Sequence, residues 1–545
     1  MAKNDTEKDI FVIELPLKVE KWQADLLDKR YNLFCNIYNY VQNKLLRQFR
    51  YFEQMSEWKN CKAKKDRRKF LESHPFTIKG FKKPIIFSKM KSKEIESDVY
   101  GVTNFVEQIV KKKVSANKTY KDFGINTTNI NALACHIWSA WEKKIYGKPK
   151  KIKDKKTGEV IEIPNKIHFK KRGDINTISL REKSGMFTGL DVDISKMCLS
   201  FNINGKTGEK TKKIIILPIN VKNLTEYEMY ALKDGYDSIC VVTIVRKLIR
   251  GKYKYYVQFT IEGEKPQKGR TLGKGNVGID IGPSTVAISS LNGVTIDTLA
   301  EKCDNIEGKI SEIERKMDRS RRATNPQNFT EDGQIKRIDR KNGEKRVWKY
   351  SKRYVKLRNK KRELLRKQRV IRKLQHNIKA NEILSLGDTF IVENNPISAW
   401  AKKAKGVRKN KNGKIQTNKR FGKSIGNHAP SMFVTILKNK VKSLKGKFVE
   451  VDPKNAASRF DFTNGDFTGH NLDERKITLS NGNTHQRDML AAFNLQHLNH
   501  KDDKLKSYNI EEMKMDYPIF CKLEKEEIKR FINGMKISNK SNIGI

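Results

Sequence analysis

The sequence predicts a multidomain α+β protein in which a helical segment is inserted in a small β-barrel and an α/β domain with a basic helical insertion follows. Three observations support this fold class. The chain has 545 residues, whereas a typical domain has ~150. The hydrophobic pattern changes along the chain from helical spacing to strand alternation, and then to a mixture of the two. The 114 Lys and Arg residues outnumber the 62 Asp and Glu residues, and the excess is spread over the whole length.

The charge balance indicates the class of partner. A compact protein with a formal charge of +52 repels itself unless a polyanion neutralises it, and nucleic acid does so with release of counterions. A basic protein on a membrane surface is the weaker alternative, and a small-molecule metabolic enzyme is nearly excluded. No apolar run approaches the ~18 residues of a membrane span, and the N-terminus lacks the apolar core of a signal peptide. The seven cysteines form no close pair, so we expect a soluble protein in a reducing compartment, without disulfides.

The first 270 residues are predicted to form two interleaved parts. Residues 1–17 supply one strand, because an apolar run starts at Ile10. Residues 18–150 form a helical domain, since apolar side chains recur there every three to five positions. Short alternating segments between 151 and 270 predict the antiparallel strands of a small barrel or sandwich, which the first strand completes. The recurring apolar residues of the first helix are Trp22, Leu26, Tyr31, Phe34, Tyr38, Val41, Leu45 and Phe49.

The second half is predicted to be an α/β domain over 271–453. A helical insertion occupies 310–380, where Lys and Arg number 25 against 8 acidic residues from 311 onward. Two interpretations of this insertion stay open with equal weight: a solvated coiled-coil hairpin, or a helix whose basic face lies along a nucleic-acid backbone. Residues 454–486 are polar and irregular, and 487–545 hold a further helix and the C-terminal tail. The residues of the apolar seam, each seven apart, are Tyr350, Leu357, Leu364, Ile371 and Ile378.

Three carboxylates stand where a hydrolytic site needs them. Asp280 lies within an apolar strand, where an unpaired charge is costly. Glu393 ends a second apolar strand at its carboxyl end, where open α/β sheets bind ligands. Asp488 opens a helix whose next turn contains two alanines, small enough for close packing on a sheet. Converging acids make an oxygen-rich site for hard divalent ions, and two Mg²⁺ ions about 4 Å apart can activate water and stabilise the leaving oxygen of a phosphodiester.

Each carboxylate alone also fits a structural role. An aspartate after Gly-Ile is often structural or part of a phosphate loop, a glutamate at a strand end is usually solvated, and an aspartate at a helix start is most often a cap. The order of the three acids and their basic surroundings favour the metal site.

These motifs resemble those of a known family. The segment GIDIGPSTVAISS resembles the first RuvC motif of TnpB proteins and the compact type V CRISPR effectors. The segments FIVENNPISAW and RDMLAAFNL resemble the second and third motifs, the third having the usual form D-x-N-A-A-x-N. The resemblance covers residues 276–500 well, and the preceding residues only in layout.

The resemblance implies an RNA-guided DNA endonuclease with one RuvC site in an RNase H-like domain. Asp280, Glu393 and Asp488 match the catalytic, metal-binding acids, with Mg²⁺ as cofactor and Mn²⁺ as a substitute. The barrel and the helical domain resemble the wedge and the recognition lobe, and the partners are a guide RNA and double-stranded target DNA beside a short flanking motif. We expect a monomer or homodimer in the prokaryotic cytoplasm, associated with the nucleoid, and no membrane partner. Basic residues expected at nucleic acid are Lys170, Lys171, Arg321, Arg322, Lys402, Lys403 and Arg487.

The sequence departs from this family in two places. The family commonly carries two C-x-x-C pairs between the second and third motifs, but residues 454–486 contain no cysteine. We therefore expect a zinc-less, degenerate finger-like insert packed on Phe460, Phe462 and Phe467, with His470 and His485 as surface histidines. The second departure is a leucine, at position 490, where the third motif usually has asparagine.

Rival functions remain. Gly-Ile-Asp-Ile-Gly also fits the first phosphate loop of actin-like ATPases, although the second phosphate loop and the adenosine motif of that class are not found. An RNA-guided DNA-binding repressor is the closer alternative, but drift to that role removes a catalytic acid, and all three acids are present. The source of the guide, a transposon-derived RNA or a CRISPR array, stays open, as do the flanking motif and collateral cleavage.

Overall fold

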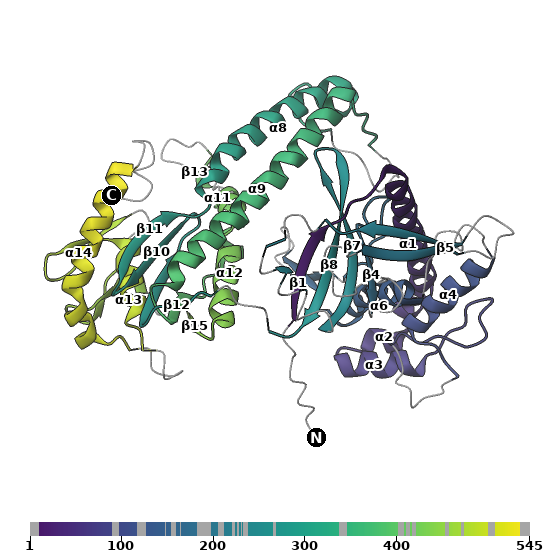
Figure 1. The fold of residues 1–545 in the computed structure, drawn as a ribbon, viewed down its shortest axis with the longest axis horizontal. Helices are drawn as coiled ribbons and strands as arrows, with labels where there is room; N and C mark the ends of the chain where they lie inside the picture. Colours follow the sequence, from purple (N-terminus) through teal and green to yellow (C-terminus); the bar gives the residue numbers. More distant parts are fainter. Residues whose placement is uncertain are drawn as a thin grey trace. The chain divides into compact units, whose positions relative to one another are not determined.

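The chain folds into two compact units, Met1–Pro266 and Gln267–Ile545, in a mixed α/β architecture of sheets and helices (Figure 1). The computed structural model describes residues 10–89, 98–116, 127–147, 149–153, 160–163, 165–181, 198–204, 212–220, 224–225, 228–229, 232, 238–264, 269–336, 346–401, 408–409, 415–416, 421–452, 457–469, 474–499 and 507–534. The finer domain boundaries expected from the sequence remain predictions.

The first unit contains a four-stranded antiparallel sheet in the order β1-β8-β7-β4. Its first strand pairs with β8 along its whole length, from Ile10↔Glu262 to Pro16↔Tyr256. The N-terminal strand therefore joins strands that follow it by more than 200 residues. The described strands form this sheet and two hairpins. An isolated bridge, Leu17↔Ile219, links the end of the β5–β6 hairpin to the end of β1, but closure into a barrel stays a prediction. The strands of this unit are β1 (Ile10–Pro16), β2 (Lys150–Lys153), β3 (Val160–Ile163), β4 (Thr177–Arg181), β5 (Cys198–Asn204), β6 (Lys212–Pro218), β7 (Ile239–Ile249) and β8 (Lys252–Glu262).

The helices of the first unit lie between β1 and the later strands, as the sequence pattern predicts. The longest is α1, whose apolar face belongs to the same core as the sheet. Tyr31 fixes this packing, because its buried hydroxyl donates to the carbonyl of Ile244 in β7 at 3.0 Å. Trp22 belongs to the predicted apolar stripe but is 49% exposed. The helices are α1 (Lys21–Gln54), α2 (Ser56–Asn60), α3 (Lys64–Ser73), α4 (Val102–Ala116) and α6 (Thr127–Tyr146).

The second unit contains a five-stranded mixed sheet in the order β11-β10-β9-β12-β15. The first three strands along the chain form an antiparallel meander. The strand β12 then pairs in parallel with β9 on one side and with β15 on the other. The carboxyl ends of β9 and β12 consequently meet at the same edge of the sheet. These strands are β9 (Asn276–Ile281), β10 (Thr285–Ser290), β11 (Gly293–Thr298), β12 (Thr389–Glu393) and β15 (Lys447–Val451).

Helices cover both faces of this sheet (Figure 1). Alternation along β9 sends Val277, Ile279 and Ile281 to one face, where they pack on α9 (Lys352–Leu384) and α12 (Pro430–Ser443). The opposite face of the sheet packs on α13 (Arg487–Gln496) and α14 (Ile510–Gly534). Apolar side chains form both interfaces between the sheet and its helices. Charged residues on the sheet face toward α13 are exceptions to this pattern.

The basic insertion is a helical hairpin rather than one continuous helical region. Its helices are α8 (Asp304–Thr324) and α9, which lie side by side in Figure 1. Lys361 on α9 pairs with Glu314 on α8 at 2.6 Å. The predicted apolar seam does not run the full length, because Tyr350 and Ile378 are each 48% exposed.

The insert before α13 consists of two short hairpins, β16–β17 and β18–β19, in its described part. Asp461 connects them, because its carboxylate accepts hydrogen bonds from the backbone N–H of Thr463 at 2.9 Å and of Ser480 at 2.7 Å. Both hydroxyls of these residues donate to it as well. Burial alone would raise the pKa of Asp461. The hydrogen bonds to its carboxylate together outweigh burial, and the pKa is lowered. The strands are β16 (Phe460–Asp461), β17 (Asp466–Phe467), β18 (Lys476–Thr478) and β19 (Thr484–Gln486).

Two expectations for this insert are wrong. Phe460 and Phe462 are buried, but Phe467 is 56% exposed and only flanks Phe460. His485 is buried rather than on the surface, because α14 packs over it: its Nδ1 lies 2.6 Å from a Glu524 carboxylate oxygen and its Nε2 lies 2.7 Å from the Tyr517 hydroxyl. His470 lies outside the described residues.

The remaining short elements are η3 (Glu301–Cys303), η4 (Pro326–Asn328), α10 (Ile397–Trp400), β13 (Arg408–Lys409), β14 (Ile415–Gln416), α11 (Gly422–His428) and η6 (Ala457–Arg459). None of the helices described here is both long and apolar enough to span a bilayer.

Candidate acidic site

Strand alternation places two of the predicted acids on the α13 face of the sheet. Asp280 lies two residues after Gly278 on β9, and the register Val392↔Ile279 brings Glu393 on β12 next to it. Both carboxylates sit at the carboxyl ends of parallel neighbouring strands, where α/β sheets bind ligands.

The third acid arrives through close packing of α13 on β9. Gly278 has no side chain because the helix backbone occupies the space: a Cβ there would lie 1.9 Å from the carbonyl oxygen of Ala492. From Gly278 to Asp280 the strand advances about 6.6 Å, and from Ala492 back to Asp488 the helix covers about 6 Å. Asp488 in the first turn of α13 is thereby carried to the same edge as Asp280.

The three acids line one cavity of about 580 Å³. Burial raises the pKa of Asp280 well above its usual range, and the charges of Asp488 and Glu393 raise it further. The pKa of Glu393 is also raised by burial, although hydrogen bonds from Asn395 and from the backbone of Ala457 oppose the shift. Three carboxylates thus share a buried space in which positive charge is needed to keep all of them ionised.

Two arginines supply part of that charge. Arg487 donates to Oδ1 of Asp488 through Nε at 3.0 Å and through Nη2 at 2.8 Å. Arg475, from the insert, brings its Nη1 to 3.5 Å from Oδ2 of the same carboxylate. Both arginines line the cavity. Arg487, which we expected at nucleic acid, therefore contacts an acid of the site.

A buried asparagine supports the Glu393 side of the cavity. Asn494 on α13 is fully buried, and its Nδ2 donates to the carbonyl oxygens of Ala457 and Phe460, each at 2.8 Å. Ala457 in turn donates its backbone N–H to the Glu393 carboxylate. The final asparagine of the third motif thus anchors the backbone that holds Glu393, while Asn395 donates to Glu393 Oε2 at 3.3 Å.

The donor set fits a hard divalent cation. Carboxylate oxygens are the ligands that Mg²⁺ and Mn²⁺ prefer. The pKa of Asp280, raised first by burial and then by Asp488 and Glu393, is one that a bound cation would lower. In the described parts of the chain, no three His, Cys, Asp or Glu side chains are already arranged to hold a metal ion. Asp488 is turned toward its two arginines, so it has to leave them to become a ligand.

The other predicted nucleic-acid contacts lie elsewhere. Arg321 and Arg322, in the last turn of α8, both bind the Asp318 carboxylate at 2.6 Å. Lys402 and Lys403 lie outside the described residues. Neither Arg321 nor Arg322 is among the residues that line the cavity.

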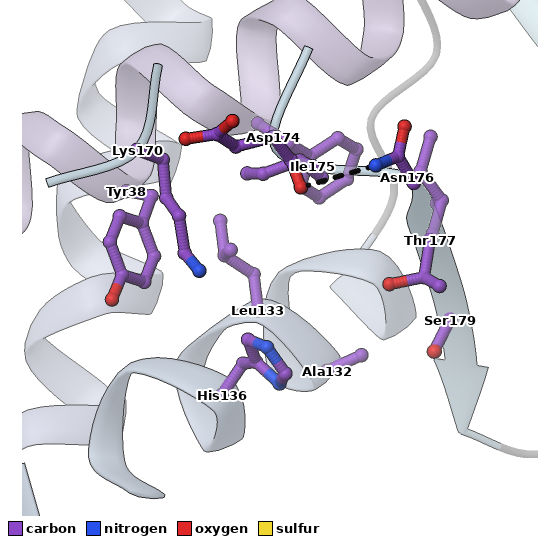
Figure 2. Close-up of a pocket in the computed structure, with 12 residues that line it drawn as sticks. Tyr38, Ala132, Leu133, His136, Lys170, Asp174, Ile175, Asn176, Thr177 and Ser179 are labelled. Atoms are coloured by element: carbon purple, nitrogen blue, oxygen red, sulfur yellow. Dashed lines mark hydrogen bonds between the residues drawn. The ribbon is translucent and has the colours of Figure 1, made fainter. Parts of the chain in front are cut away.

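Lys170 and Lys171 belong to the first unit. Lys170 lines a small recess of about 100 Å³ between α1, α6 and β4, with its ammonium 5.9 Å from the ring centre of Tyr38 (Figure 2). Figure 2 shows His136 and Leu133 on the other wall of this recess. Lys171 is exposed, and its backbone N–H donates to Asp174 at 2.7 Å.

Several residues of the cavity were not singled out in the sequence. Trp400 belongs to the second quoted motif and Asn395 follows Glu393 closely, so both carried a local signal. Arg459, Arg475 and Phe421 carried none, because they come from the insert and from the start of a short helix.

Comparison with known proteins gives structural matches alone. No family model matches the chain, and no curated protein does. One similar solved structure is described as a cryo-EM structure of the Cas12f1–sgRNA–target DNA complex, with 15% identity, a TM-score of 0.43, and coverage of 91% of this chain and 99% of that chain. Another is described as a cryo-EM structure of a CRISPR–Cas12f ternary complex, with 15% identity, a TM-score of 0.27, and coverage of 89% and 83%. Both are compact type V CRISPR effectors, which the three sequence motifs also resemble.

Proposed function

We propose that this chain is an RNA-guided DNA endonuclease that cuts phosphodiesters at this acidic cavity. The observation that carries the proposal is the convergence of Asp280, Glu393 and Asp488 on one cavity in a protein with a formal charge of +52. An antiparallel meander joined to two parallel strands is also the arrangement expected of an RNase H-like domain. The similar Cas12f1 structure is a complex with sgRNA and target DNA, and we propose the same classes of partner here.

The three carboxylates would hold the divalent cations. When bound, these ions supply an activated water and charge stabilisation for the leaving oxygen. Asp280, between the other two acids, is the group whose ionisation the cations most favour, because its pKa is raised by burial and by both neighbours. Asn494 and Ala457 keep Glu393 in place. Arg487 and Arg475, once released from Asp488, are positioned to receive the phosphate of the substrate strand.

Retention of all three acids in one cavity favours a nuclease over a guided repressor. A repressor needs the basic surfaces but not a buried carboxylate at position 280, which costs stability.

The test uses full-length protein with the RNA that copurifies with it, whose sequence identifies the guide. We expect Mg²⁺-dependent cutting of matching DNA, and at least ~100-fold slower cutting by Asp280→Ala. Gel-shift affinity for the target should change little, because the guide pairs with DNA away from the cavity. EDTA should stop cleavage and Mg²⁺ should restore it, and elemental analysis should find far less than one zinc per chain.

Full cleavage by Asp280→Ala would remove the cavity from the reaction. Equal loss of binding and cleavage, with a lowered melting temperature, would reassign Asp280 to a structural role.

A further inference from the structure

The cavity is larger than three acids and their cations require, and one part of its wall is aromatic. Its volume of about 580 Å³ lies within the range of sites that bind whole small molecules. Trp400, at the end of α10, and Phe421, immediately before α11, both line it. The same cavity therefore presents carboxylates, arginines and two flat apolar rings.

The two aromatic residues are brought together by backbone contact. A Cβ on Gly422 would lie 3.0 Å from the carbonyl oxygen of Ala401, so the residues that follow Trp400 and Phe421 touch. Phe421 is 56% exposed and Trp400 is half-buried. An exposed phenylalanine makes little packing contact with the core of the unit, but it stacks on a flat ligand when one enters the cavity.

The neighbouring charges indicate what that ligand is. Arg459, Arg475 and Arg487 line the cavity together with the aromatic rings. Guanidinium groups bind phosphates in a forked geometry, and aromatic rings stack on bases of any sequence. One nucleotide of a strand carries both a phosphate for the arginines and a base for the aromatic rings.

We propose that Trp400 and Phe421 hold one unpaired nucleobase beside the phosphodiester that is cut. The inference rests on the proposed function and deepens it. The cavity accepts a strand in which one base is unpaired and can unstack from the adjacent bases. Bases within a duplex are stacked on each other and cannot offer a face to these rings. The two aromatic residues are thus positioning residues that select single-stranded over double-stranded nucleic acid at the acids.

The first test measures base stacking without cleavage. In the guide-loaded Asp280→Ala protein, single-stranded DNA with 2-aminopurine at successive positions should show quenched fluorescence at one position near the cut. Phe421→Ala and Trp400→Ala should each remove most of this quenching, and Trp400→Phe should retain it. Trp348→Ala is the matched control, because Trp348 contacts Arg321 and Phe329 rather than the cavity.

The second test measures cleavage with otherwise wild-type protein. One abasic nucleotide at the quenched position should slow cutting about tenfold, since base–aromatic stacking is lost. Trp400→Ala and Phe421→Ala should cut the intact and the abasic strands at similar, reduced rates. Because Phe421 is exposed, we expect Phe421→Ala to keep the fold. Its melting temperature, measured alongside the cleavage rates, should equal that of wild type.

Unchanged quenching in Phe421→Ala and Trp400→Ala, or abasic sensitivity equal to that of wild type, would overturn this inference. If Asp280→Ala still does not cut DNA in that case, the proposed endonuclease function is retained and only the proposed aromatic subsite is rejected. Quenching that is equally strong with a duplex would also overturn it, because the cavity would then accept paired bases.

Discussion

The acidic cavity and the α8–α9 hairpin belong to the same unit but are held together differently. At the cavity, α13 is buried from Asp488 to Gln496 and lies against β9 without space for a single methyl group at Gly278. In the hairpin, α8 buries only Ile310, Ile313 and Met317, and exposed ion pairs supply many of the other contacts.

This difference separates two kinds of functional charge. The carboxylates are fixed by a close-packed core, which tolerates little change in geometry. The basic side chains of the hairpin are held by exposed ion pairs, each contributing about 0–1 kcal/mol. Such side chains can exchange their acidic partners for phosphates at small cost, whereas the cavity keeps its arrangement before any partner binds.

The largest expected effect comes from disturbing the packed helix. Gly278→Ala places a methyl group 1.9 Å from the Ala492 carbonyl oxygen and 2.4 Å from the Gln496 nitrogen. Because both atoms belong to backbone, α13 has to shift, and we expect a loss of about 3 kcal/mol or more in the free energy of unfolding. Cleavage should fall in parallel, since Asp488 moves away from Asp280. Thermal unfolding and cleavage rates measure both effects.

Gly308→Ala in α8 is the matched control. An added Cβ there meets nothing within 4 Å, and alanine in a helix is better than glycine by about 0.5–1 kcal/mol. A Gly278→Ala protein as stable as Gly308→Ala would contradict the account of how α13 positions its aspartate.

A smaller effect is expected from the charge of Asp280 in the protein without metal. Its pKa is raised in the folded state by burial, by Asp488 and by Glu393. The folded protein therefore holds a proton that the unfolded chain has released, so stability falls as the pH rises above the ordinary aspartate value, ~3.9, toward the raised value. Asp280→Asn removes this loss, and its melting temperature should exceed that of wild type at pH 8, in EDTA.

The advantage of Asp280→Asn should shrink as the pH falls through ~3.9, because the carboxyl is then protonated in the unfolded chain as well as in the folded protein. Asp332→Asn, in an exposed turn, is the matched control. A destabilised Asp280→Asn protein at pH 8 would mean that the carboxylate is compensated by its surroundings.

The smallest effects are expected in the hairpin. Arg321→Ala and Arg322→Ala each remove an ion pair with Asp318, which contributes about 0–1 kcal/mol of stability, together with a cation–π contact on the Phe329 ring. If these arginines bind phosphates, each variant should reduce the slope of log affinity against log salt by about one. Asp318→Ala should act in the opposite direction and strengthen RNA binding, because it releases both arginines. Weaker binding by Asp318→Ala would show that the pairs with Asp318 are themselves needed.

The positions of the acids could be predicted because they follow from local patterns. Alternation along β9 fixes the face of Asp280, a strand end fixes Glu393, and the alanines after Asp488 predict close helix packing. The long first helix followed equally from its apolar spacing.

Contacts made by distant segments could not be predicted in this way. Arg475 reaches Asp488 because the β18–β19 hairpin pairs Lys476 with Gln486 and so sets Arg475 beside Arg487, and no periodicity in the insert encodes that pairing. His485 is buried by Glu524 and Tyr517 from α14, more than 30 residues later. In both cases a polar residue in an irregular segment gains its role from tertiary contacts.

Binding of Mn²⁺, measured by electron paramagnetic resonance on the guide-loaded protein, tests most directly whether the three carboxylates form one metal site. We expect wild-type protein to bind Mn²⁺ at the cavity, and Asp280→Ala to lose at least tenfold in affinity, while both proteins remain folded at the temperature of the measurement. Cleavage should depend on Mn²⁺ concentration with the same midpoint as binding. Equal Mn²⁺ affinity in the folded Asp280→Ala protein, or cleavage that continues in EDTA, would contradict the account.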